Sequence, residues 1–184
     1  MWHWLLTSTT YGTWLPGDAR GSVTSVRDYR PGDGSPTSRI EHAKYGEAWE
    51  PPAKGLRRSA EGTLKGPPVL LTSEHAQCLL SEFQRTASHH GWRLTAVALM
   101  ANHLHLVVGL PRETSSVKSL QEFKAYGSRV LNVSFGKPKS GTWWTKSGSR
   151  RLLPDEEALA AAINYVIHRQ AAPLLTWSNG STST

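Results

Sequence analysis

Two histidines, His103 and His105, are separated by a single residue in an apolar run at 102–108. Alternate side chains of a β-strand point to the same side. Both imidazoles would therefore project from one face, with Leu104 and Leu106 turned to the core. Neutral imidazole is a common ligand of divalent cations, so the pattern predicts half of a metal site. The alternative is that both rings simply lie on a solvated face of a sheet.

Tyr126 is the next residue whose type could do chemistry. It lies at the border of the apolar stripe of a predicted helix, with Glu122 one turn before it and Arg129 near its polar side. The simpler interpretation of such a tyrosine is half-buried packing with its hydroxyl in water.

Positive charge is concentrated in one part of the chain. The sequence has 21 Lys and Arg against 14 Asp and Glu, and residues 111–151 contain nine bases and two acids. Aromatic residues interleave with these bases, a pattern that suits the binding of single-stranded nucleic acid. The alternative is a solubilising face over core tryptophans. The candidate DNA-binding residues are Arg112, Lys118, Lys124, Arg129, Lys146, Arg150 and Arg151.

The elements that must position these residues follow from hydrophobic periodicity and capping signals. Their order predicts an α+β sandwich of ferredoxin-like type with a mostly antiparallel sheet. The expected strands are 2–9, 92–100, 103–110 and a short one at 143–145; the expected helices begin at Thr72, Ser116 and Pro154 and end near Gly91, Leu131 and His168.

The chain is predicted to form a single domain over residues 1–177, interrupted by a long irregular insertion at about 25–68 that is rich in Pro, Gly and Ser. Residues 178–184 are expected to be a disordered tail. The single cysteine, Cys78, excludes an internal disulfide framework. No secretory signal or membrane-spanning run is apparent, so a cytoplasmic protein without membrane contact is expected.

Together these residues resemble a known family. A strand with His-hydrophobic-His, followed by a helix with one tyrosine, resembles the HUH endonucleases that use a single nucleophilic tyrosine. Within them the chain looks like the insertion-sequence transposases and their REP-associated relatives. The segments at 11–18, 100–106 and Asn164-Tyr165-Val166-Ile167 also fit that subgroup.

The resemblance implies a ferredoxin-like domain that cuts and rejoins single-stranded or hairpin DNA. It implies that His103 and His105 hold Mg²⁺ or Mn²⁺ at the scissile phosphate. It further implies that Tyr126 attacks phosphorus to leave a 5′-phosphotyrosine and a free 3′-hydroxyl. Relatives work as dimers or monomers, so a homodimer is possible.

The sequence departs from the family pattern at the third metal ligand. Several members have a polar ligand one turn after the tyrosine, where this chain has Val130, and Glu122 is the candidate replacement. The C-terminal Asn-Pro pair of the relatives is also absent. Two alternatives therefore stay open: a domesticated DNA-binding module without catalysis, and a metal-dependent hydrolase with water as its nucleophile.

Overall fold

The computed structural model describes residues 1–19 and 53–180. The chain divides into two compact units, Met1–Thr13 with Lys65–Thr184, and Trp14–Leu64. Most of the predicted insertion at 25–68, and the end of the predicted tail, fall outside the described residues. No helix in the described ranges is long and apolar enough to cross a membrane.

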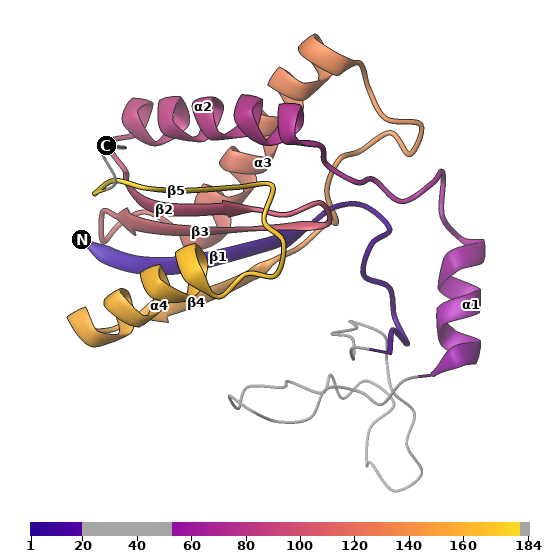
Figure 1. Cartoon of the computed structure of the whole chain (residues 1–184), viewed down its shortest axis with the longest axis horizontal. Helices are drawn as coiled ribbons and strands as arrows, with labels where there is room; N and C mark the ends of the chain where they lie inside the picture. The colour runs from indigo at the N-terminus through magenta and orange to yellow at the C-terminus, as the bar shows by residue number, and fades with distance from the viewer. Residues whose placement is uncertain (20–52, 181–184) are drawn as a thin grey trace, which may run out of the picture. The chain divides into compact units, whose positions relative to one another are not determined.

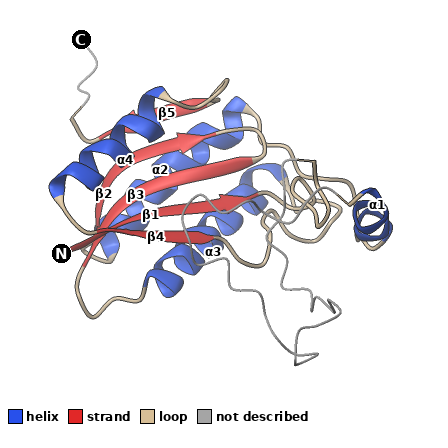
Figure 2. Cartoon of the chain, turned by 90° about the horizontal axis from the view of Figure 1, so that it is seen from below, coloured by secondary structure: helices blue, strands red, loops and turns tan. Residues whose placement is uncertain are grey.

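The larger unit is an α+β sandwich, as predicted. Its sheet has the strand order β4-β1-β3-β2-β5, and every neighbouring pair is antiparallel (Figure 2). The succession β1-α2-β2-β3-α3-β4 with the order 4-1-3-2 is the ferredoxin-like arrangement. The element bounds are β1 Trp2–Thr9, α2 Ser73–His89, β2 Arg93–Leu99, β3 His103–Leu110, α3 Ser116–Phe135, β4 Ser149–Leu153, α4 Glu156–His168 and β5 Leu175–Ser178.

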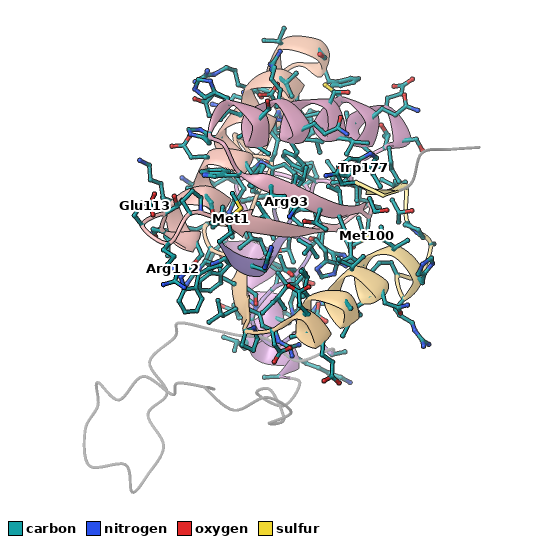
Figure 3. All side chains as sticks on the ribbon, turned by 90° about the vertical axis from the view of Figure 1, so that its left-hand side faces the viewer. Met1, Arg93, Met100, Arg112, Glu113 and Trp177 are labelled. Carbon is teal, nitrogen blue, oxygen red and sulfur yellow. The ribbon has the colours of Figure 1, made fainter. Side chains whose placement is uncertain are left out.

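Helices cover both faces of this sheet. In Figure 3 the strands run between α2 on one side and α4 on the other, with Met100 on the α4 side. On the first side, Leu104 and Leu106 pack in the main core with Phe83 of α2 and Phe123 of α3. On the second side, Val107 packs in a smaller core that includes Val166 of α4. Figure 1 shows α3 behind the strands and α4 in front of them.

The helix starts follow the capping residues that the sequence indicates. Thr72 and His75 form a reciprocal capping box at the start of α2. The Asp155 carboxylate accepts the Ala158 N–H at 2.8 Å and caps α4. α3 begins where predicted but continues four residues beyond the predicted end at Leu131, to Phe135.

The prediction of a short strand at 143–145 is wrong. The fourth strand is β4, and only an isolated bridge joins Thr10 to Trp144. Trp143 and Trp144 are buried, and their indole N–H groups donate to Asn132 and to the Lys124 carbonyl of α3. Both side chains anchor the loop to α3, because a tryptophan buries more apolar surface in the core than it would on a short strand.

The predicted start of the disordered tail, at residue 178, is also wrong. Ser178 ends β5, an edge strand that pairs with β2. Four residues are too few to give a period in the sequence, and the strand exists because β2 offers it an unpaired edge.

In the smaller unit, residues 54–62 form the helix α1 (Lys54–Gly62), where the sequence was predicted to be irregular. The Ala53 N–H donates to the Gly17 carbonyl at 3.3 Å. Within α1, Arg57 pairs with Glu61 at 2.9 Å, one turn later. Leu56, Arg58 and Ala60 are good helix formers, and the exposed ion pair adds a small stabilisation.

The loop that leads into β4 is held from the α3 side. The Lys124 ammonium donates to the carbonyls of Thr145 at 2.5 Å and of Ser147 at 3.0 Å. Burial lowers the pKa of Lys124 to about 8. The Thr145 hydroxyl in turn donates to the Thr9 carbonyl at 3.2 Å, so this loop is tied to the end of β1.

Lys124→Met should lower the free energy of unfolding by about 1–3 kcal/mol, because the loop carbonyls lose a charged donor. Chemical denaturation followed by circular dichroism measures this. The control is Lys118→Met, an exposed lysine in the first turn of the same helix. Equal stability of the two variants would show that Lys124 does not hold the loop.

Gly148→Ala should also destabilise the fold, by about 1–3 kcal/mol. A Cβ at this position would lie 2.5 Å from the Thr7 carbonyl oxygen and 2.7 Å from Leu120 Cδ2, so the loop would have to move away from β1. Gly180→Ala is the control, because a Cβ there meets nothing within 4 Å. Thermal unfolding of the two variants against the wild type is the measurement.

Candidate metal and nuclease site

The two histidines lie on the α4 side of the sheet. On β3 they alternate with Leu104 and Leu106, which belong to the core under α2 and α3. Across the β1–β3 pair, His103 is opposite Thr9 and His105 is opposite Thr7. The sequence therefore predicted the alternation correctly, but both faces of β3 are covered by helices.

His105 is buried, with 6% of its surface exposed, so the face is not the solvated one of the alternative interpretation. Burial, together with the charge of His103, lowers its pKa to about 4. The ring is therefore neutral at pH 7, which is the state that a metal ligand requires.

Each histidine ring has its Nδ1 atom beside a side-chain oxygen. His105 Nδ1 lies 2.7 Å from the Thr7 hydroxyl, and His103 Nδ1 lies 2.6 Å from Asn102 Oδ1. The ring centroids are 5.0 Å apart. His105 Nε2 is buried and has no hydrogen-bond partner; His90 Nε2 shares this property among the described side chains. An unpartnered buried nitrogen beside a second imidazole suits a cation that binds through Nε2.

Tyr165 of α4 lies beside His105. Its ring centroid is 5.4 Å from that of His105, in an edge-to-face arrangement, and 42% of its surface is exposed. α4 is fixed to the sheet by Ala162 and Val166, which are buried in the core on this side. Tyr165 therefore lies over a buried histidine and is still accessible from outside.

Tyr126 lies elsewhere, which corrects the expectation that it joins the histidines in one site. It lines a groove of about 470 Å³ formed by residues of α2 and α3, on the side of the sheet away from α4. Its ring centroid is 6.3 Å from that of His90, and the Arg129 guanidinium lies 5.0 Å from its ring centre. Within one chain the sheet separates Tyr126 from His103 and His105.

Glu122, the candidate third ligand, is likewise on α3 rather than α4. The described ranges contain no group of three or more His, Cys, Asp or Glu side chains arranged to hold a metal ion. Among the described residues, the candidate ligands that lie side by side are the imidazoles of His103 and His105.

The seven candidate DNA-binding cations are spread over different surfaces. Arg151 shares its side of β4 with Leu5 of the core under α4, and Lys146 is exposed in the loop before β4. Lys124 is occupied with loop carbonyls. The other four lie away from the histidines. Arg112 lies near Met1 and Glu113 (Figure 3), and Lys118 is at the start of α3. Arg129 lines the groove, and Arg150 lies on the Leu6 side of β4.

Sequence reasoning missed Tyr165, although Asn164-Tyr165-Val166-Ile167 was one of the segments that fitted the resemblance. The local signal was present: Tyr165 directly precedes Val166 and comes three residues after Ala162, both inward-facing. The sequence does not encode which side of the sheet α4 covers, so the signal could not be tied to the histidines.

Part of the chain is similar to known proteins. Residues 68–150 match the family described as IS200-like transposases. No curated protein matches the sequence. Two solved structures are similar to the chain. The first is a REP-associated tyrosine transposase bound to a REP hairpin, with 9% sequence identity and a TM-score of 0.48; the match covers 89% of this chain and 63% of that one. The second is a candidate transposase from Deinococcus radiodurans R1, with 16% sequence identity and a TM-score of 0.47; the match covers 92% of each chain.

The family match covers α2, β2, β3, α3 and the first two residues of β4, and so includes His103 and His105 but ends before Tyr165. The part of the chain that carries the two histidines is therefore similar to the IS200-like transposases.

Proposed function

We propose that the chain is a metal-dependent endonuclease and strand transferase for single-stranded or hairpin DNA, with Tyr165 as its nucleophile. The observation that carries the proposal is the contact between Tyr165 and His105, whose ring centroids are 5.4 Å apart. Tyr126 belongs to the groove of α2 and α3, and its role is packing with Arg129.

His103 and His105 are the residues that would hold the divalent cation, Mg²⁺ or Mn²⁺. The fit rests on the neutral state of His105 and on its buried Nε2 atom without a partner. When bound, the cation would polarise a phosphate oxygen and neutralise developing charge. Beside these two imidazoles of the described residues, water and the scissile phosphate would complete the coordination of the cation.

In the reaction, the Tyr165 oxygen forms a bond to phosphorus, and the bond from phosphorus to the 3′-oxygen breaks. The products are a 5′-phosphotyrosine and a 3′-hydroxyl, and the phenolic proton is balanced by the proton that the 3′-oxygen gains. The number of phosphodiester bonds is conserved, so a second 3′-hydroxyl can reverse the step without ATP. The exposure of Tyr165 allows a strand to reach it.

Arg151 is the cation best placed to hold a phosphate of the strand, because it lies on the histidine side of β4. Lys146, exposed in the loop before β4, is the second candidate. A homodimer stays a prediction, and so does the cytoplasmic location.

Tyr165→Phe should abolish the covalent adduct between the protein and DNA, and Tyr126→Phe should keep it. The measurement uses labelled single-stranded and hairpin oligonucleotides from the flanks of the gene, with Mg²⁺ or Mn²⁺, on a denaturing gel. The adduct should be protease-sensitive and absent in EDTA.

An adduct that survives in Tyr165→Phe and is lost in Tyr126→Phe would contradict the assignment and indicate that Tyr126 reaches the site from a second chain. Cleavage without any adduct would point to water as the nucleophile. Binding without cleavage would favour the DNA-binding module.

His105→Ala should abolish saturable Mn²⁺ binding, because it removes the buried Nε2 ligand. Electron paramagnetic resonance of free Mn²⁺ gives the bound fraction without any DNA. The matched control is His89→Ala, an exposed histidine in the last turn of α2. Mn²⁺ affinity that is unchanged in His105→Ala would remove this histidine from the metal site.

A further inference from the structure

Thr7 stands beside the buried histidine without belonging to the candidate ligand set. It is the β1 residue directly opposite His105, and its hydroxyl oxygen lies 2.7 Å from His105 Nδ1. Cross-strand register fixes this contact, because Leu6 and Ser8 on either side are buried toward the opposite face. The side chain of Thr7 therefore has one direction available, toward the imidazole.

The neighbouring ring, His103, shows how such a contact determines which ring nitrogen carries the proton. Asn102 Oδ1 lies 2.6 Å from His103 Nδ1, and a carbonyl oxygen can only accept a hydrogen bond. In this arrangement His103 Nδ1 carries the proton. The lone pair of this ring is then on Nε2.

For His105 the hydroxyl can donate or accept, so the surroundings of the other nitrogen decide between the tautomers. His105 Nε2 is buried and has no partner. If Thr7 donated to Nδ1, the proton would be on Nε2, and an N–H donor would be buried without an acceptor. If Thr7 accepts from Nδ1, Nε2 presents a lone pair instead, as His103 does.

We infer that Thr7 is a positioning residue that holds His105 in the Nδ1–H tautomer, so that both histidines present Nε2 to a single cation. A metal-bound histidine usually donates its other N–H to an oxygen acceptor, which fixes its orientation and raises its basicity. The identity of the bound group rests on the proposed function. The tautomer itself does not, because the contact exists in the chain alone.

The first experiment reads the tautomer directly. Protein labelled with ¹⁵N at histidine is measured by NMR without metal, near pH 7.5, where the ¹⁵N shifts separate Nδ1–H from Nε2–H rings. The wild type should show His105 as Nδ1–H. Thr7→Val should shift it toward Nε2–H, and Thr7→Ser, which keeps the hydroxyl, should restore the wild-type signal.

The matched control is Thr9→Val, on the same face of β1. The Thr9 hydroxyl contacts Thr145 at 2.9 Å and no histidine ring, so this variant should leave the His105 signal unchanged. A wild-type His105 with the proton on Nε2 would overturn the inference, even if no variant folded. A Thr7→Val protein that folds and keeps the Nδ1–H ring would overturn it as well.

The second experiment measures Mn²⁺ affinity of the same proteins by calorimetry. Loss of such an oxygen acceptor typically weakens a metal site by about 10–100-fold, which is the change expected for Thr7→Val, with recovery in Thr7→Ser. A wild type that has the Nδ1–H ring but binds no Mn²⁺ would overturn the metal site of the proposed function and leave the role of Thr7 in the tautomer intact. Equal affinity of wild type and Thr7→Val would overturn the positioning role.

Discussion

The structure depends on the alternation of β3 between two covered faces. Leu104, Leu106 and Val108 pack in the large core under α2 and α3, and this apolar set fixes the register of the strand. The intervening residues must then face α4. A shift by one residue would place the imidazoles in the main core and the leucines beside α4. The position of the candidate metal ligands is thus a consequence of hydrophobic packing on the other side of the sheet.

Burial of this second face gives the site its properties. Because α4 covers it, His105 stays neutral at physiological pH and its Nε2 atom is buried without a hydrogen-bond partner among the described residues. The same helix carries Tyr165 over the ring. The neutral state of His105 and the adjacent phenol therefore both depend on the burial of Ala162 and Val166 against the sheet. The orientation of the ring depends on Thr7 of β1 instead. A solvated sheet face would provide none of these.

The sheet separates the surroundings of the two helical tyrosines, Tyr126 and Tyr165. Tyr126 and Tyr165 both lie at the borders of amphipathic helices, and both are partly accessible. The ring of Tyr126 lies under the Arg129 guanidinium in the groove of α2 and α3, and the ring of Tyr165 meets His105 edge to face. Lys124 shows the same division among the cations: its ammonium is occupied with loop carbonyls, so its charge supports β4 rather than a phosphate. Residue type alone did not separate these roles.

The sequence by itself determined the elements whose periodicity is strong: β1, α2, β2, β3, α3 and α4, and with them the ferredoxin-like order and the two histidines on one face. These features are local, because a period of two or of 3.6 residues and a capping side chain are visible in a short window. The tertiary structure alone decided that β4 follows Trp144 rather than including it, that β5 exists, and that α4 brings Tyr165 to the histidines while α3 takes Tyr126 and Glu122 away. Each of these depends on which surface an element is packed against. That choice is made by burial between segments far apart in the chain, which no local pattern encodes.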